Sequence, residues 1–330
     1  MRVAAIDCGT NSLRLLVADA DPAGGSLADV DRRLEIVRLG QDVDATGRLA
    51  PEALARTLRV LRSYAAIIEA VGVSAVRMAA TSATRDAANA AEFVAGVRAV
   101  LGIEPEVLSG EEEAWLSFTG ATAELAGQPA GPYLVADIGG GSTEFVLGDA
   151  AAAGADRAAA DPAAARPAAA QPAGAVSVNI GCVRMTERHL RSDPPTGAEV
   201  AAARADIDAA LDVVEAKIPV ADARTLVGLA GSVTTVAALA MGLDSYDASR
   251  IHHSRISAAA VDAQTTRLLG QTRAERARLA VMHPGRADVI GGGALVLMRI
   301  MARFGFGEVL VSEHDILDGL AWSLAAGTGR

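Results

Sequence analysis

Short apolar runs and longer periodic stretches alternate along the first part of the chain. Residues 3–19 contain two apolar runs separated by a polar turn with a glycine, and residues 34–39 form a third run, which predicts three strands. Pro51 opens a periodic stretch that predicts a helix to about residue 70. The further predicted elements are a strand at 73–79, a helix after residue 86, a strand at 105–108 and a helix from residue 110. This alternation predicts an α/β layer architecture.

The second half of the chain restarts the pattern. Residues 133–148 again read as strand, glycine turn and strand, at an offset of 130 residues from the first hairpin. The matching positions are Asp7 and Asp137, Gly9 and Gly139, and Ser12 and Ser142. Two unrelated glycine hairpins could match by chance, but a repeat of this period favours two copies of one domain. The later predicted elements are helices at 183–190, 196–217, 286–303 and 315–326 and strands at 225–229 and 308–312.

Residues 149–175 differ from both halves because they are almost wholly Ala, Gly, Pro, Asp and Arg. With no large apolar residue, the segment has nothing to bury in a core, which predicts a disordered loop. The flanking residues 144–149 and 175–181 read as adjacent antiparallel strands. The loop is therefore predicted to be an insertion in a hairpin.

Composition restricts the class of ligand. Hydrophobic residues make up 51% of the 330 residues, enough for two domains with cores, whereas aromatic residues make up 3%. So few aromatic residues, with a formal net charge of −10, argue against a nucleic-acid or anionic-membrane partner. Cys8 and Cys182 form no disulfide framework, Asp7 interrupts the N-terminal apolar run, and no charge-free apolar run is long enough for a membrane span. We therefore expect a cytoplasmic protein that holds any polyanion by backbone amides, a few arginines or a metal.

Three turns rich in Gly, Ser and Thr follow apolar strands, namely Gly9–Ser12, Gly139–Thr143 and Gly231–Thr234. Glycine lets the backbone approach a ligand closely, and consecutive amides form concavities that suit phosphate oxygens. The third turn also opens a predicted helix, whose N-terminus favours anions. None matches a P-loop or a dinucleotide fingerprint, and a single such turn is usually only a turn. Three of them together favour phosphate binding.

Carboxylates near these turns are candidates for a metal site and for a base. Asp137 ends a strand and Glu144 lies across the turn, where the two could hold Mg²⁺ together with phosphate oxygens. The alternative is that Asp137 caps the turn and Glu144 faces solvent. The glutamates at positions 111, 112 and 113 open a helix, where acidic residues usually complement the helix dipole, although one could act as a general base.

Other polar and glycine residues give weaker signals. Arg85 follows a Thr-Ser-Ala-Thr turn and is either a phosphate clamp or an ordinary surface arginine. His252 and His253 have no further His or Cys at ligand spacing, which argues against a zinc site. Gly291–Gly293 lies in an apolar helical stretch and predicts close helix packing rather than a fourth phosphate loop.

Six segments carry a resemblance to a known family, in the order AIDCGTNSLRLLVAD, RLGQDVDATGRL, ATSATRDAANA, LSGEEEAWLSFTGA, VADIGGGSTEFVLG and GLAGSVTTVAAL. With VLVSEHDILDGLAWSL near the end, they resemble the exopolyphosphatase/guanosine-pentaphosphate phosphatase family, in its short form without C-terminal accessory domains. The resemblance implies two ribonuclease-H-like α/β domains of the actin, sugar-kinase and heat-shock-chaperone superfamily, with an interdomain cleft. We expect one domain at 1–125 and the other at 126–330, with the helix at 315–326 able to pack back on the first.

The resemblance also assigns roles by position. The catalytic glutamate of the family falls on Glu113, with Glu112 as the alternative, and its Mg²⁺ ligands fall on Asp137 and Glu144. Its phosphate-contacting positions fall on Thr10, Asn11, Ser12, Arg85, Gly140, Gly141, Ser142, Gly231 and Ser232.

These roles imply Mg²⁺-dependent hydrolysis of the terminal phosphoanhydride of inorganic polyphosphate, distributive and active on short chains. Guanosine pentaphosphate is the alternative substrate. A sugar- or acetate-type kinase and a non-catalytic nucleotide or polyphosphate sensor are alternatives of other classes, and the SGEEEA motif favours water as the acceptor. No nucleic-acid or membrane partner is expected, and a homodimer is left open.

Overall fold

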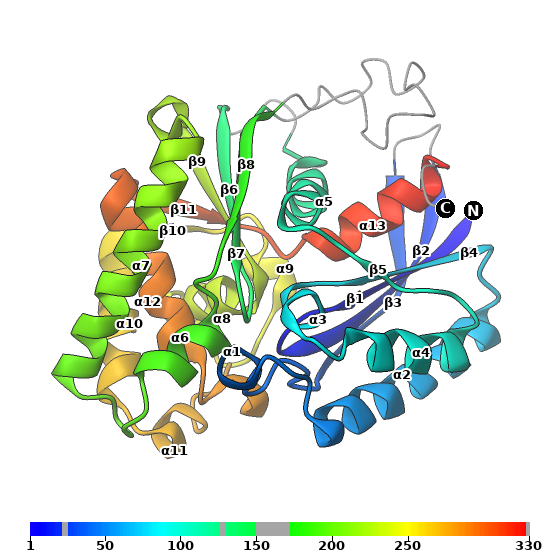
Figure 1. The fold of residues 1–330 in the computed structure, drawn as a ribbon. Coiled ribbons are helices and arrows are strands. Elements are labelled where there is room, and N and C mark those ends of the chain that lie inside the picture. The colour runs from blue at the N-terminus through cyan, green and yellow to red at the C-terminus, as the bar shows by residue number, and fades with distance from the viewer. Residues whose placement is uncertain (22–25, 126–129, 150–171, 328–330) are drawn as a thin grey trace. The chain divides into compact units, whose positions relative to one another are not determined.

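The computed structural model describes residues 1–21, 26–125, 130–149 and 172–327, which form two compact units. The first contains the elements from β1 to α5 together with α13 (Ile316–Ala325), and the second contains those from β6 to β11 (Figure 1). Most of the loop predicted to be disordered at 149–175 lies outside the described residues. Its last part was predicted wrongly, because strand β8 already begins at Pro172 and runs to Val178.

The first unit contains a five-stranded mixed sheet in the order β3-β2-β1-β4-β5. β1 (Arg2–Cys8) pairs antiparallel with β2 (Ser12–Asp21) and parallel with β4 (Ala75–Ala80), and β5 (Glu106–Val107) continues in parallel. The strand predicted at 34–39 is misplaced, because β3 covers Ser26–Ile36 at the edge of the sheet. Most β3 side chains are exposed, so its sequence carries no apolar run that would reveal it.

Helices cover both faces of this first sheet. α2 (Pro51–Val71) and α4 (Ala90–Leu101) pack on one face, where Leu61 and Phe93 share a core with inward side chains of β1 and β2. α13 lies on the other face and buries Leu317 and Leu320 against β1 and β2 (Figure 1). The remaining helices of the unit are α1 (Val43–Thr46), α3 (Ser82–Asp86) and α5 (Gly110–Thr122).

α5 and α13 meet backbone to backbone. A Cβ on Gly120 would overlap the carbonyl of Asp315, and a Cβ on Gly319 would overlap the carbonyl of Leu116. Only glycine permits so close an approach at these two positions. Three arginines of the sheet also bind α13 and its N-cap, in the pairs Arg14–Asp315, Arg32–Asp318 and Arg77–Ser323.

The second unit repeats the first sheet and adds one strand, in the order β8-β7-β6-β9-β11-β10. β6 (Tyr133–Ile138) and β7 (Thr143–Gly148) form the antiparallel hairpin, and β6, β9 (Thr225–Leu229) and β11 (Glu308–Val311) are parallel. The strands β8, β7, β6, β9 and β11 correspond in order and direction to β3, β2, β1, β4 and β5 of the first sheet. This correspondence confirms the predicted repeat. β10 (Arg255–Ser257) is the addition.

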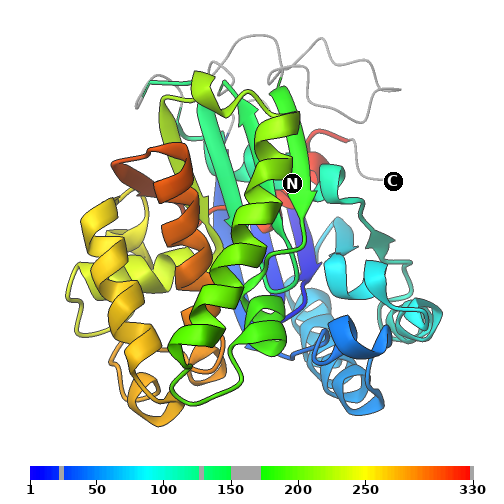
Figure 2. The ribbon, with the colours of Figure 1, turned by 60° about the vertical axis from the view of Figure 1, so that its left-hand side comes forward.

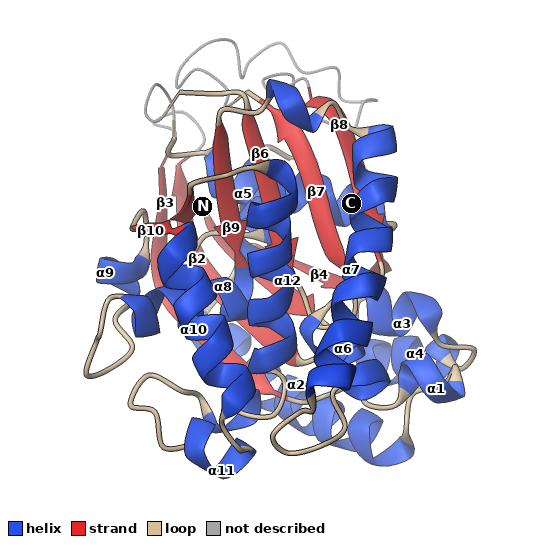
Figure 3. Ribbon diagram, turned by 90° about the vertical axis from the view of Figure 1, so that its left-hand side faces the viewer, coloured by secondary structure: helices blue, strands red, loops and turns tan. Residues whose placement is uncertain are grey.

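Helices of the second unit pack over its sheet, and Figure 3 shows α7 (Gly197–Lys217), α12 (Ile290–Phe304) and α10 (Ala258–Gly270) side by side over one face. Figure 2 shows α7 and α12 from another side. The other helices are α6 (Cys182–His189), α8 (Ala230–Ala240), α9 (Ala248–Ile251) and α11 (Arg273–Arg276), with 3-10 turns at Val220–Asp222 and Pro284–Arg286.

The glycines of α12 pack closely, as predicted. A Cβ on Gly293 would overlap the Ser232 side chain, and a Cβ on Gly292 would lie 2.8 Å from the Cys182 carbonyl oxygen. No helix within the described part of the chain has both the length and the apolar character needed to cross a bilayer.

Candidate active site

The turn between β1 and β2 is tied to the turn that carries Arg85. The Gly9 amide closes the first turn by donating to the Ser12 carbonyl at 2.9 Å. Thr10 is buried, and its hydroxyl lies 2.8 Å from the Ser82 hydroxyl in α3. The Asn11 carbonyl accepts hydrogen bonds from the amides of Val37 and Arg38, which follow β3. The Thr10 hydroxyl thus joins two of the segments predicted to contact phosphate.

The structure places the predicted phosphate clamp beside the predicted base. Arg85 Nη1 donates to the Leu108 carbonyl at 2.8 Å and to Glu113 Oε2 at 3.1 Å. Glu113 is only 8% exposed. A buried carboxylate next to a guanidinium is the kind of polar pair that active sites contain.

The three consecutive glutamates of α5 have different environments. Glu112 Oε2 accepts from the Ser109 amide at 2.9 Å and from its hydroxyl at 2.8 Å, and the Glu112 amide donates back to Ser109 Oγ. These hydrogen bonds, led by the one from the Ser109 amide, lower the pKa of Glu112. Glu111 is exposed and Glu113 is buried. Glu112 therefore caps the helix, which favours Glu113 as the base. The Ser-x-x-Glu spacing of a capping box was visible in the sequence and could have separated the two.

Asp7, at the end of β1, lies opposite Arg14 on β2. Arg14 donates to Asp7 Oδ2 at 2.7 Å and 3.0 Å, and it also binds Asp315, the N-cap of α13. Burial raises the pKa of Asp7, although the charge of Arg14 opposes this. Among the described residues, Asp7 Oδ1 has no hydrogen-bond partner.

In the second unit, the equivalent hairpin places two carboxylates opposite each other. Asp137 on β6 pairs in register with Glu144 on β7, and they are 7% and 2% exposed. Ser177 donates to Glu144 Oε1 at 2.7 Å. Two buried carboxylates on neighbouring strands repel each other unless a cation lies near. Their hard oxygen ligands fit Mg²⁺, which takes its other ligands from water and phosphate oxygens.

The glycine turn of this hairpin has its carbonyls engaged by the N-terminus of α6. The carbonyls of Gly139, Gly140 and Gly141 accept hydrogen bonds from the amides of Cys182 at 2.9 Å, Val183 at 2.9 Å and Gly181 at 3.2 Å, respectively. Arg184 Nε also donates to the Gly141 carbonyl, at 2.7 Å. Within the described residues, the amides of Gly140 and Gly141 have no acceptor. This arrangement suits a loop that presents amides to an anion.

The third turn lies where β9 leads into α8. Ala230 has a left-handed backbone conformation with φ 67°, and the side chain of Ser232, two residues later, is buried. Arg286 covers Gly231, and its Nη1 lies 3.4 Å from the Gly231 carbonyl and 3.3 Å from Thr235 Oγ1. Sequence reasoning missed Arg184 and Arg286 as cations beside these turns, because each is distant in sequence from the turn that it contacts.

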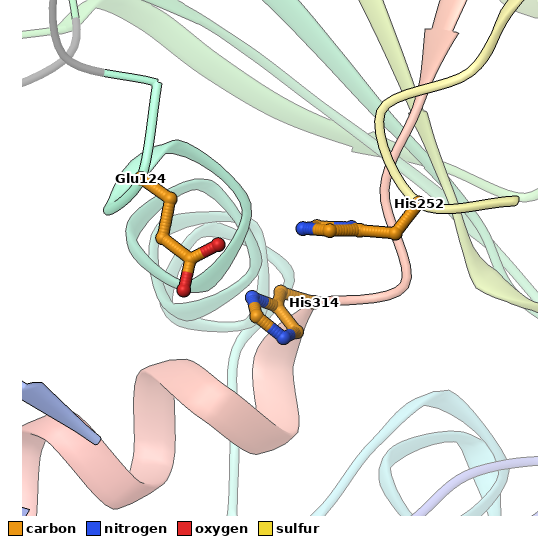
Figure 4. Close-up of side chains that lie close together, drawn as sticks. All are labelled: Glu124, His252 and His314. Atoms are coloured by element: carbon orange, nitrogen blue, oxygen red, sulfur yellow. The ribbon is translucent and has the colours of Figure 1, made fainter. Parts of the chain in front are cut away.

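Three histidines gather near β11 of the second unit. The His252 ring stacks on His253 with centroids 3.7 Å apart, and the His314 ring lies 4.5 Å from His252. Figure 4 labels His252 and His314, together with Glu124 of the first unit. His252 Nδ1 accepts from the Glu313 amide at 3.1 Å, so a neutral His252 carries its proton on Nε2 and has no lone pair there for a metal. His314 lies far along the chain from His252 and His253, so their spacing in the sequence gives no sign of it.

Comparisons with known proteins agree with this fold. The model of the Ppx/GppA phosphatase family matches residues 16–326. Exopolyphosphatase 2 of Mycobacterium tuberculosis is 50% identical over 335 aligned positions, which cover 98% of each chain. A solved PPX-GPPA enzyme from Aquifex aeolicus is 31% identical with a TM-score of 0.77, over 98% of this chain and 99% of its own.

A further solved structure supports the fold alone. An exopolyphosphatase from Cytophaga hutchinsonii is 23% identical with a TM-score of 0.85, over 100% of both chains. The expected α/β fold with two actin-like domains is confirmed by these neighbours and by the two related sheets. From the match to the family model and the identity over nearly the whole chain, the protein belongs to the Ppx/GppA phosphatase family.

Proposed function

We propose that the protein is an exopolyphosphatase, which hydrolyses the terminal phosphoanhydride of inorganic polyphosphate and releases phosphate. The observation that carries the proposal is the buried Glu113 beside Arg85, at the start of a helix whose cap is formed by a different glutamate. The name of the Mycobacterium tuberculosis relative, Exopolyphosphatase 2, supports this substrate.

The family resemblance suggests a division of tasks among these residues. Glu113 takes a proton from water as the water oxygen bonds to the terminal phosphorus and the bridging P–O bond breaks. The shortened chain leaves with the electron pair of that bond. Arg85 and the amides of Gly140 and Gly141 hold phosphate oxygens. Mg²⁺, held by Asp137 and Glu144, would neutralise the charge on phosphate oxygens.

The low content of basic residues supports distributive action on short chains. The sequence has 30 Lys and Arg against 40 Asp and Glu. Charges beyond roughly 8–10 Å are screened at ordinary salt, so phosphates outside the site would add little affinity. We propose that the enzyme releases its product after one or a few cuts, and that it acts in the cytoplasm. The comparison of short with long polyphosphate in the test below examines the proposed preference for short chains.

The test is phosphate release with Mg²⁺ from short polyphosphate, long polyphosphate, guanosine pentaphosphate and ATP, measured side by side. We expect the highest kcat/KM on short polyphosphate. Higher kcat/KM on guanosine pentaphosphate would replace the proposed substrate with the second one that the family resemblance implies. Release from ATP alone would reject both.

A variant pair tests the base. Glu113→Gln keeps the shape of the side chain but cannot accept the proton, so we expect turnover to fall at least 10²-fold with substrate binding retained. Glu112→Gln is the matched control and should lower turnover by less than about threefold, because glutamine can also serve in a capping box. The opposite order of effects would place the base at Glu112.

A further inference from the structure

The ion pair between Arg85 and Glu113 weakens the proposed base. A neighbouring cation stabilises the ionised carboxylate and so reduces its affinity for a proton. The pair is 3.1 Å long, and its side chains are 26% and 11% exposed, so water screens it only partly. A base held in this way is poorly prepared to take a proton from water.

Arg85 has a way to leave the pair without losing its anchor. Its Nη1 also donates to the Leu108 carbonyl at 2.8 Å, and this contact fixes the end of the side chain independently of Glu113. The guanidinium is the more exposed member of the pair. A terminal phosphate offers several charged oxygens to the planar fork of an arginine, against the single oxygen of Glu113 that it now contacts.

We propose that Arg85 restrains Glu113 in the resting enzyme and releases it when a terminal phosphate binds. This inference rests on the proposed exopolyphosphatase function and adds a control step to it. Arg85 turns its donors to the phosphate, and Glu113 becomes basic enough to take the proton of the attacking water. After phosphate leaves, Glu113 gives the proton to solvent and pairs with Arg85 again. The base is thus active only when there is a phosphate to transfer.

Other charged groups belong to the elements packed around α5, and each has its own partner or lies exposed. Among the described residues of the first unit they include Glu111, Glu112 bound to Ser109, Asp315 bound to Arg14, Asp318 bound to Arg32, and Glu106 bound to Arg77. All of them remain when Arg85 is changed. A difference between the wild type and an Arg85 variant therefore reports the pair itself.

The first test needs no catalysis. Protein labelled with ¹³C at the glutamate carboxyl carbon is titrated by NMR without substrate, and the Glu113 signal is identified by its loss in Glu113→Gln. In Arg85→Gln, which keeps a polar amide but removes the charge, we expect the titration midpoint of Glu113 to rise by about one pH unit. Arg85→Lys, which keeps the charge, should stay closer to the wild type. An unchanged midpoint in Arg85→Gln would overturn the restraint.

The second test asks whether the substrate releases the base. The acidic limb of kcat/KM reports the free enzyme and that of kcat reports the complex. For the wild type on short polyphosphate, we expect the kcat/KM limb about one pH unit below the kcat limb. In Arg85→Gln the two limbs should coincide, with KM raised. Coincident limbs in the wild type would show that the pair persists in the complex and would overturn the release. If the wild type releases no phosphate, the proposed function fails, while the NMR titration still decides the restraint.

Discussion

The hairpins β1–β2 and β6–β7 share a backbone plan but differ in one charge. In both, a glycine amide closes the turn, at 2.9 Å in the first and 3.0 Å in the second, and an aspartate lies near the end of the first strand. The cross-strand partner of Asp7 is Arg14, whereas the partner of Asp137 is Glu144, at the same offset of 130 residues. One position of the repeat thus holds a cation in one copy and an anion in the other.

This difference decides what each hairpin can do. In the first hairpin, Arg14 neutralises Asp7 and also forms an ion pair with Asp315. The carbonyl of Asp315 in turn packs against Gly120 of α5. The hairpin is therefore part of the support of the helix that bears Glu113. The second hairpin instead places two buried carboxylates opposite each other, and hard oxygen ligands of this kind suit a divalent cation. The same backbone gives a fixed support in one unit and a candidate metal site in the other.

Reversing the charge of the first hairpin is the strongest way to break the comparison. Arg14→Glu would bury three carboxylates, those of Asp7, Asp315 and the new side chain, without a cation. We expect the free energy of unfolding to fall by about 3–5 kcal/mol, measured by urea denaturation. Arg14→Met removes the cation without adding an anion and should be less damaging. Equal stability of Arg14→Glu and the wild type would show that the pair has no supporting role.

Neutralising the second hairpin should have a smaller effect of the opposite sign. Without Mg²⁺, Glu144→Gln relieves the repulsion with Asp137, so we expect a higher melting temperature than in the wild type. Saturating Mg²⁺ should raise the wild-type melting temperature by about 5 °C, since a ligand at 100 times its Kd adds roughly 2.7 kcal/mol. The variant should lose most of this response. Asp7→Asn, which neutralises the carboxylate of the first hairpin, should keep it, and its loss there would contradict the assignment.

The smallest expected effect separates support from chemistry within α5. Glu112→Ala removes the cap and should lower the free energy of unfolding by about 1 kcal/mol at pH 7, with kcat unchanged. Because the folded protein lowers the pKa of Glu112, the cap stabilises the protein above the ordinary value of 4.5 and loses this effect as pH falls. The difference between variant and wild type in urea denaturation should therefore shrink in acid. A difference that grows in acid would contradict the cap.

The hairpins and their repeat could be predicted because glycine turns between apolar strands leave a clear local pattern. β3 could not, since an exposed edge strand has no buried face to mark it. The short elements α9, β10 and α11 were also missed, because three or four residues leave no period to read. The helix α10 was missed although it has 13 residues and buries Val261, Leu268 and Leu269.

Side-chain environments divide in the same way between local and distant signals. The pairing of Asp137 with Glu144 follows from hairpin geometry, so the sequence could suggest it. The contact of Arg85 in α3 with Glu113 in α5 joins two helices that are separated in the sequence by α4 and β5. No periodicity in the sequence indicates it. Arg286 reaches Gly231 from a segment far along the chain, which only the folded unit reveals.

The central claim is that the second hairpin, and not the first, holds the metal. Isothermal titration with Mn²⁺, as a probe for Mg²⁺, tests it on the wild type, on Asp137→Asn/Glu144→Gln and on Asp7→Asn. We predict one ion per chain for the wild type and for Asp7→Asn, and no binding at the same concentrations for the double variant. Retained binding by the double variant, or loss of the ion in Asp7→Asn alone, would contradict the account.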